Sequence, residues 1–479
     1  MRLTSASEVS SDLNHDTGIS PKMADDSSNQ QVLLSVEAEA YVEAIETFRV
    51  QDIGSTKWMK QHEYLEKLNI QAVLHASSNQ DEFVKEMLLS HEKIPVVIQE
   101  LLALEVWKQN VFSIIQRMDF EPKTTFPLYM ALYHEATLSN LLETILFHKE
   151  PCEAAEDCVL DLVDYCHRKI TDLVARQEEN QDEEEAELPK DGKSIDESSA
   201  MEELKKQQQK IQFDVSIKAI SIFRYITDHL SSLSLSVTTR ILNTLDIPSL
   251  LVQLVDDPPW TKYKDGKLSK YIDNKWQEVA PADRLQLTRL EGQVWIALFN
   301  LLMGPDCQQK YAFNPHNKAQ ILKLRSHLTE VLVDQIPNLC ELQRYLSNLS
   351  MMDPPAAQTG IVLEQVPEIQ ERILKENEGK WKAIAKHQVK NFFNSSAESM
   401  RDQAKMFADM YNFDVLESLI AEPPKCALCG SPAAKRCSRC QNEWYCRREC
   451  QVTHYSKHKI ACNLMVEAEQ KLKEASLNS

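Results

Sequence analysis

Eight residues near the C-terminus have the side-chain types and the spacing of zinc ligands. Seven cysteines and one histidine fall within 37 residues, in the order Cys426-x2-Cys429-x7-Cys437-x2-Cys440-x5-Cys446-x3-Cys450-x7-His458-x3-Cys462. Zinc prefers four thiolate or imidazole ligands in a tetrahedron, so this set suffices for two ions. Each Cys-x2-Cys turn can present two thiolates to one ion, and each x3 pair can present two ligands from one helix face. Because protein would fill every position, the predicted sites are structural, whereas a catalytic zinc keeps one position open for water.

Disulfide bonds are the alternative use of these cysteines. The sequence shows no signal peptide, and thiols stay reduced in the cytosol, so we expect metal binding instead. An odd number of cysteines completed by one histidine also fits a metal better than disulfides. His454 is a rival ligand, since it lies four residues after Cys450 and four before His458, but the spacing to Cys462 favours His458.

This segment resembles the MYND-type zinc finger in its ligand order and in the Trp444-Tyr445-Cys446 approach to the third pair. The family usually has Trp where Tyr455 stands. MYND fingers bind short, often proline-containing peptides, so the resemblance implies a peptide groove near Trp444 and Tyr455; packing of Trp444 between the zinc sites is the alternative. The two sites of the family interleave, which implies one zinc on Cys426, Cys429, Cys446 and Cys450 and a second on Cys437, Cys440, His458 and Cys462.

The composition excludes several classes of function. The net charge of −19 argues against nucleic acid or an anionic membrane as the main partner. No apolar run approaches the ~20 residues of a membrane span, so we expect no transmembrane segment and a cytoplasmic location. The chain has nine glycines, none closer than twelve residues to another, which rules out a P-loop or a dinucleotide-binding loop. No Ser/His/Asp, HExxH or kinase pattern is visible either, so we expect no enzyme activity.

The body of the chain is predicted to be all-α, because glycine is scarce and Leu, Glu, Lys and Gln are abundant. Residues 94–102 and 247–254 share an Ile-Pro opening, in which proline occupies the first helical turn. With the apolar stretch 294–302 they resemble pieces of armadillo repeats. The resemblance implies an α-solenoid (armadillo/HEAT-like), a stack of helix pairs with a long concave surface. An Asp-Gly signal between aromatic residues predicts an inserted β-hairpin near residues 260–279.

Composition changes along the chain predict its domain organisation. One long helix is expected over 367–394, a second one after a cap at Ser395-Ser396, and a short joint at Glu422-Pro423-Pro424. The predicted segments are a disordered extension (1–31), a first helical block (32–176), an acidic flexible linker (177–203), a second helical block (204–352), long helices and connector (353–424), the finger (425–463) and a short helical or disordered tail (464–479).

A second group of possible ligands lies in the first helical block. Cys152, Cys158, Cys166 and His167 suggest a metal site, but their spacing does not form a tight ligand set. Cysteine is also a common small core residue on helices. We therefore interpret these residues as part of the core.

Several longer stretches carry a family resemblance from about residue 32 to the end of the finger. Residues 65–69, 159–168, 379–387 and 435–446 are similar to the MYND zinc-finger factors for cytoplasmic preassembly of axonemal dynein arms. This resemblance implies a non-enzymatic co-chaperone or scaffold that supports ciliary motility. The implied location is the cytoplasm, including centrosomes or centriolar satellites and the apical region of ciliated cells. The implied partners are a leucine-rich-repeat dynein assembly factor, heat-shock chaperones and axonemal dynein chains.

Other MYND proteins supply two rival functions. Some are lysine methyltransferases, but those need glycine-rich cofactor loops, which this sequence lacks. Others recruit transcriptional corepressors. Composition does not exclude that adaptor role, although no obvious basic import cluster is present.

Overall fold

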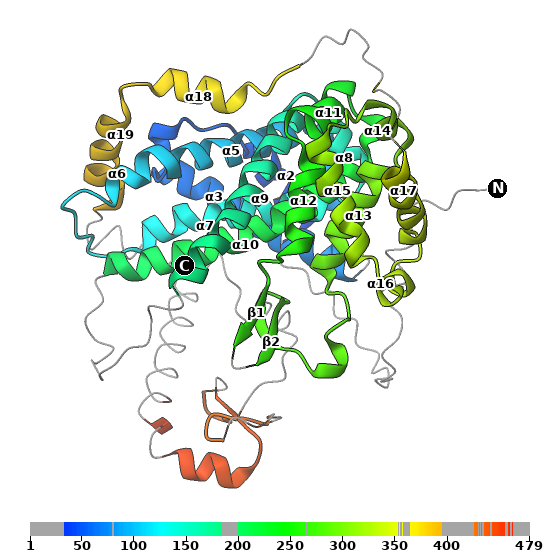
Figure 1. Cartoon of the computed structure of the whole chain (residues 1–479). Coiled ribbons are helices and arrows are strands. Elements are labelled where there is room, and N and C mark those ends of the chain that lie inside the picture. Colours follow the sequence, from blue (N-terminus) through cyan, green and yellow to red (C-terminus); the bar gives the residue numbers. More distant parts are fainter. Residues whose placement is uncertain are drawn as a thin grey trace. The chain divides into compact units, whose positions relative to one another are not determined.

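The computed structural model divides the chain into two compact units, Met1–Met410 and Tyr411–Ser479. Figure 1 shows both units. The structure describes residues 33–78, 81–183, 200–264, 266–352, 354, 357, 365–394, 426–429, 431, 433, 435–440, 443–455, 458–459 and 462. The predicted disordered extension, the Ser395-Ser396 cap, the Glu422-Pro423-Pro424 joint and the predicted tail lie outside these residues.

The first part of the larger unit is built from helices around one very apolar segment, α5. Most residues of α5 are buried, and the helix packs against α7, α9 and α18. This burial is expected of a helix that is hydrophobic on all sides. Pro95 lies in the first turn of α5. Proline is tolerated there because the N–H groups of the first turn have no acceptor within the helix. The helices of this part are α2 (Ser35–Ala44), α3 (Thr56–Ser78), α4 (Phe83–Ser90), α5 (Ile94–Trp107), α6 (Ser113–Ile115), α7 (Phe126–Ile145), α8 (Lys149–Ala154) and α9 (Cys158–Glu183), with short turns at Val50–Asp52 and Lys108–Phe112.

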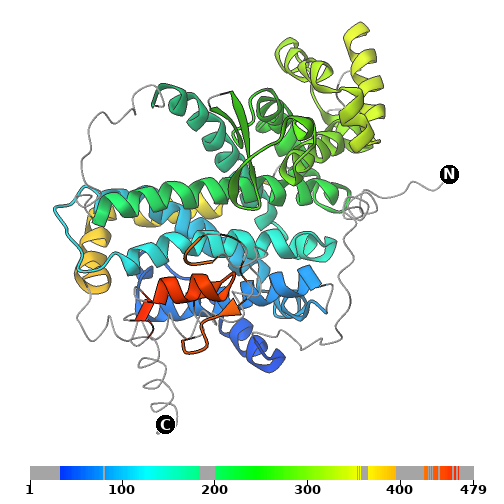
Figure 2. The ribbon, with the colours of Figure 1, turned by 90° about the horizontal axis from the view of Figure 1, so that it is seen from below.

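The second part continues from α10, which packs against α7, α9 and α13 and so joins the two parts. Figure 2 shows the green α10 beside the cyan α7. Helix α13 is capped by Thr288, whose hydroxyl accepts from the Glu291 N–H. The elements are α10 (Ala200–Asp228), α11 (Leu235–Thr239), α12 (Ile247–Asp256), α13 (Arg289–Met303), α14 (Pro305–Lys310), α15 (Pro315–His327), α16 (Glu330–Gln335), α17 (Leu339–Met351), α18 (Ile369–Asn377) and α19 (Trp381–Gln388), with short turns at Leu230–Ser232, Arg240–Thr244, Pro281–Asp283 and Val389–Phe393.

The inserted β element is a three-stranded sheet. The sequence predicted a hairpin, which has two strands, so the third strand was not predicted. Strands β1 (Thr261–Lys264), β2 (Lys267–Ile272) and β3 (Lys275–Glu278) are antiparallel in the order β1-β2-β3. The missed turn is Asp273-Asn274, where both residues have positive φ (49° and 61°), as a tight two-residue hairpin turn requires. Tyr271 on β2 connects the sheet to α10. Its ring packs edge-on against the ring of Phe213, with the ring centroids 5.0 Å apart.

Two predicted boundaries differ from the structure. Helix α9 runs to Glu183 and α10 begins at Ala200, so the start of the predicted acidic linker 177–203 is helical. The single helix predicted over 367–394 is two helices, α18 and α19. Gly379 between them has φ +74°, a left-handed conformation that ends an α-helix and that glycine adopts without strain.

A cluster of buried charges ties α5, α7 and α9 together. Lys169 contacts both Glu135, at 2.9 Å, and Glu105, at 3.3 Å, and Lys108 pairs with Glu135. Burial alone would raise the pKa of Glu135, but Lys108 and Lys169 outweigh it and lower the pKa to about 2. The carboxylate is therefore ionised and paired, as a buried charge must be to avoid a large desolvation penalty.

Helices α18 and α19 return to the N-terminal helices, as Figure 1 shows for α18 beside α5. The side chain of Gln388, fully buried, accepts from the Trp107 indole N–H at 2.8 Å and donates to the Val50 carbonyl at 2.8 Å. Just beyond α19, the Phe393 ring lies over Gly54, where an added Cβ would approach the ring to 2.8 Å. Residues 369–393 thus belong to the helical body, although the sequence analysis assigned them to a separate connector.

No helix among the described residues is long and apolar enough to cross a membrane.

We expect the Gln388→Leu substitution to destabilise the helical body. Leucine keeps the volume but leaves the Trp107 N–H and the Val50 carbonyl without partners, which costs about 1–3 kcal/mol per buried group. Urea unfolding of purified full-length protein measures the effect. The matched control is Lys386→Ala, an exposed change in the same helix with an expected effect within about 0.5 kcal/mol. Equal unfolding midpoints for the two variants would contradict the role assigned to Gln388.

Candidate metal centre

The finger is a short strand pair followed by a helix. Strands β4 (Lys435–Arg436) and β5 (Trp444–Tyr445) pair antiparallel, and residues 448–455 form a helix. Backbone hydrogen bonds close the ligand-bearing turns: the Cys426 N–H donates to the Ser431 carbonyl and the Cys437 N–H to the Glu443 carbonyl, both at 2.8 Å. The turns place the first two cysteine pairs, and the helix carries Cys450.

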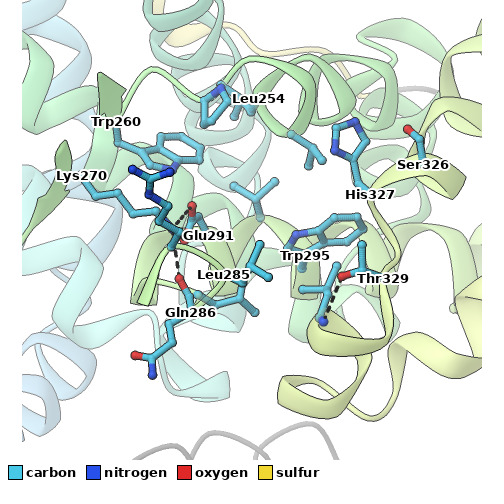
Figure 3. A pocket seen from close by; sticks show the side chains of 16 residues that line it. Leu254, Trp260, Lys270, Leu285, Gln286, Glu291, Trp295, Ser326, His327 and Thr329 are labelled. Carbon is cyan, nitrogen blue, oxygen red and sulfur yellow. Dashed lines mark hydrogen bonds and ion pairs between the residues drawn. The ribbon is translucent and has the colours of Figure 1, made fainter. Parts of the chain in front are cut away.

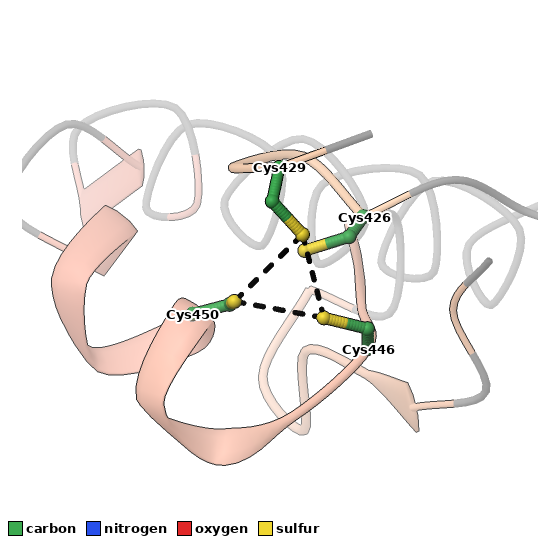
Figure 4. A group of neighbouring side chains, drawn as sticks. All are labelled: Cys426, Cys429, Cys446 and Cys450. Carbon is green, nitrogen blue, oxygen red and sulfur yellow. Dashed lines mark hydrogen bonds between the residues drawn. The ribbon is translucent and has the colours of Figure 1, made fainter. Parts of the chain in front are cut away.

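The first ligand group brings the first and third cysteine pairs together. Figure 4 shows the four sulfurs of Cys426, Cys429, Cys446 and Cys450 converging from the turn, the end of β5 and the helix. The Cys446 sulfur lies 3.5 Å from the sulfurs of both Cys429 and Cys450, and the last two are 3.9 Å apart. The structure thus gathers the set that the MYND resemblance implied for one ion.

The second ligand group combines the second cysteine pair with His458 and Cys462. The sulfurs of Cys437 and Cys462 are 3.9 Å apart, and the Cys440 sulfur lies 3.4 Å from His458 Nε2. All four residues are buried, and their ligating atoms lie within 4.8 Å of one another. The sites therefore interleave along the chain, as the resemblance implied.

The donor set and its spacing fit two zinc ions. A tetrahedron with Zn–S bonds of about 2.3 Å places its sulfurs about 3.8 Å apart, close to the observed separations. The twelve cysteines are free thiols, and separations of 3.5–3.9 Å are far longer than a disulfide bond of about 2.05 Å. With four protein ligands at each site, zinc would act as a structural crosslink between segments of the finger.

Burial and hydrogen bonds affect the thiols of the two ligand groups differently. Hydrogen bonding to Cys429 and burial raise the pKa of Cys446 to about 12. Burial alone would also raise the pKa of Cys437, but the backbone N–H groups of Cys440 and Arg439 lower it to about 6. Thiolates this close repel one another, so full ionisation of each group requires a bound cation.

His454 is placed beside the second site and outside both ligand groups. Its Nδ1 lies 3.0 Å from the hydroxyl of Tyr445, and its ring stacks on that of His458 at 6.0 Å. Tyr445 itself is buried, and burial with the nearby Glu443 raises its pKa to about 12. His454 therefore acts on the site through packing, and the choice of His458 from the spacing agrees with the structure.

Trp444 belongs partly to the core of the finger and partly to its surface. It packs against the buried cysteine cluster, and the Arg436 guanidinium lies 4.4 Å from its ring centroid. Leu428, Val452 and Tyr455 are exposed large apolar side chains of the same finger. Trp444 and Tyr455 were predicted from the sequence to lie near a surface groove, whereas Leu428 and Val452 were not. The latter two are apolar residues between or beside the ligands that zinc binding does not require, and this is the sequence signal for them.

The second possible ligand set is not assembled. Among the described residues, only the two finger groups bring three or more potential ligand atoms together. Cys152 and Cys166 are buried in the helical core, and burial raises the pKa of both thiols, that of Cys152 to about 12. The interpretation of these two cysteines as core residues is confirmed, while Cys158 and His167 are half-buried at its edge.

Comparisons with known proteins agree with this geometry. The MYND finger family matches residues 426–462. A zinc finger MYND domain-containing protein 10 homolog from Drosophila melanogaster is 33% identical over 444 residues, which are 88% of this chain and 97% of that protein. This chain belongs to the same family of MYND zinc-finger proteins. No solved structure matches the chain. Family membership thus extends through the helical body as well as the finger.

We expect the purified protein to carry two zinc ions per chain. Cys437→Ala should reduce this number and unfold the finger, because metal binding supplies most of the folding free energy of so small a module. Native mass spectrometry and elemental analysis measure the stoichiometry. Cys340→Ala, which removes a half-buried cysteine from α17, is the matched control and should keep both ions. Equal zinc content in the two variants would rule out the assigned ligand set.

Proposed function

We propose that this protein is a non-enzymatic co-chaperone or scaffold in the cytoplasmic preassembly of axonemal dynein arms. The MYND finger recruits protein partners, and the helical body holds client or chaperone surfaces. The implied partners are a leucine-rich-repeat dynein assembly factor, heat-shock chaperones and axonemal dynein chains. Centrosomes or centriolar satellites and the apical cytoplasm of ciliated cells are the proposed sites of action.

The observation that carries the proposal is the closed coordination of both finger sites. Four protein ligands per ion leave no position for a reacting water, so the zinc sites support a binding role over a catalytic one. The same ligands hold Trp444 half-buried at the surface, with exposed Leu428, Val452 and Tyr455 on the finger. Exposed apolar side chains on a metal-rigidified module favour recognition of a peptide.

The helical body supports the second half of the proposal. Helices α5 and α12 both open with Ile-Pro, and α13 is a buried apolar helix that packs on α10 and α12. We propose that these helices form an armadillo-like solenoid whose broad surface binds large protein clients. The assignment to dynein preassembly itself comes from the resemblance of residues 65–69, 159–168, 379–387 and 435–446 to that family.

The proposal includes the absence of enzyme activity. It can be tested against the lysine methyltransferases that contain MYND fingers, because their cofactor is known. Such enzymes bind S-adenosylmethionine through glycine-rich loops, which this chain lacks. We expect no saturable binding of S-adenosylmethionine to the purified zinc-loaded protein in isothermal titration calorimetry. Saturable binding at one site per chain would contradict the scaffold role as the only activity.

We expect recruitment of the leucine-rich-repeat assembly factor to require a folded finger. Cys426→Ala should abolish its capture by the immobilised full chain, because loss of a ligand unfolds the first site. The thermal unfolding of the helical body should stay nearly unchanged, since the body is a separate compact unit.

The same Cys340→Ala variant serves as the control for this experiment, because it removes a cysteine without touching the finger. It should capture the assembly factor as the unmodified chain does. Capture that persists in Cys426→Ala would place the binding surface elsewhere in the chain.

A further inference from the structure

The helical body contains a tryptophan-lined pocket in the second helical part. Its walls come from the end of α12, the sheet, the segment after the sheet, and helices α13, α15 and α16. The cavity volume is about 310 Å³. Figure 3 shows Trp260 and Trp295 on opposite sides of the cavity. The walls between them are aliphatic and include Leu254, Val294 and Leu332. Such a volume is at the lower end of ligand pockets, about 300–1,000 Å³, and suits one or two side chains.

One polar group in this pocket has no partner. The indole N–H of Trp260 has no hydrogen-bond acceptor among the described residues, although the side chain is only 1% exposed. An unpaired buried donor costs about 1–3 kcal/mol, so natural structures rarely leave one unmatched. The nitrogen itself is covered by protein atoms, so it is not open to a ligand in this conformation.

Two charged pairs and one arginine lie around the pocket. The Lys270 ammonium contacts the Glu291 carboxylate at 3.0 Å, and His327 Nε2 lies 2.8 Å from the Asp256 carboxylate. Arg284 is exposed and makes no ion pair with any described residue. Its positive charge stands out on a chain whose net charge is −19.

The residue next to this arginine is apolar and also exposed. Leu285 lines the pocket and is 66% exposed, an unusual place for a large apolar side chain beside a cavity. The pocket therefore presents an apolar interior and a rim with one cation and one aliphatic side chain.

We propose that this pocket binds an acidic–apolar peptide segment of a partner protein. One large apolar side chain of the peptide enters between Trp260 and Trp295. A flanking carboxylate of the peptide pairs with Arg284. This site does not involve the zinc finger, and it stands whether or not the chain acts in dynein assembly.

The test uses the full-length zinc-loaded chain labelled with 5-fluorotryptophan and observed by ¹⁹F NMR. Trp260→Phe and Trp295→Phe variants assign the two pocket resonances. The probe is the peptide acetyl-Glu-Glu-Leu-Phe-Glu-Glu-amide. Two further peptides serve as controls, one with lysine in place of each glutamate and one with serine in place of leucine and phenylalanine.

We expect the acidic peptide to shift both pocket resonances saturably. Its lysine counterpart should bind about fivefold more weakly, the effect of one exposed ion pair. The serine peptide should bind about tenfold more weakly or worse, because it lacks the apolar side chain that fills the cavity.

Charge reversal at the rim gives the matched variants. Arg284→Glu should remove the preference for the acidic peptide, whereas Arg344→Glu, an exposed change of equal charge on α17, should retain it. The proposal is overturned if no peptide gives a saturable shift of the pocket resonances. Equal affinity for the three peptides, shifts confined to other tryptophans such as Trp444, or an unchanged preference in Arg284→Glu would overturn it as well.

Discussion

Repulsion between crowded thiolates is the constraint on which the finger depends. The four sulfurs of the first ligand group, and the three sulfurs and one nitrogen of the second, lie within 4.8 Å of one another, too close for several negative charges without a cation. Zinc would neutralise part of this charge and fix four side chains from distant turns at once. The short strand pair and the single helix around the sites contain little hydrophobic core beyond Tyr445 and the cysteines themselves. The surface shape of the finger, including Trp444, is thus a consequence of coordination.

The helical body is held by different forces. Its stability comes from apolar burial around α5, from paired buried charges such as Lys169 with Glu135, and from the contacts of Gln388 with Trp107 and Val50. These interactions need no metal. Because the two units depend on independent forces, a change that unfolds the finger need not disturb the body.

The two kinds of recognition surface also differ in chemistry. The finger presents exposed apolar side chains beside its two ligand groups, whereas the pocket in the body is a partly open cavity lined by Trp260 and Trp295. An exposed patch favours rapid, reversible contact, and an enclosed pocket favours selection of one side chain. In the proposed scaffold, the two surfaces would hold two different segments of its partners together.

The sequence by itself determined the zinc chemistry and the helical character of the body. Ligand type and local spacing are properties of short stretches, and so are the Ile-Pro helix openings at 94 and 247, which is why they could be predicted. The interleaved pairing of the ligands was available only through resemblance, since spacing alone does not say which turn meets which. Asp273-Asn274 is a local turn signal for the third strand, although the predicted hairpin did not include that strand.

The tertiary structure alone decided which distant residues meet. The contact of Gln388 with Trp107, the packing of Phe393 over Gly54, and the gathering of Trp260, Arg284 and Trp295 around one pocket join segments that no local pattern relates. Such contacts depend on how helices pack, and packing is set by the summed shape of many side chains. Local sequence therefore specifies the elements and the metal ligands, while the pocket and the return of α18 and α19 arise only when the whole body folds.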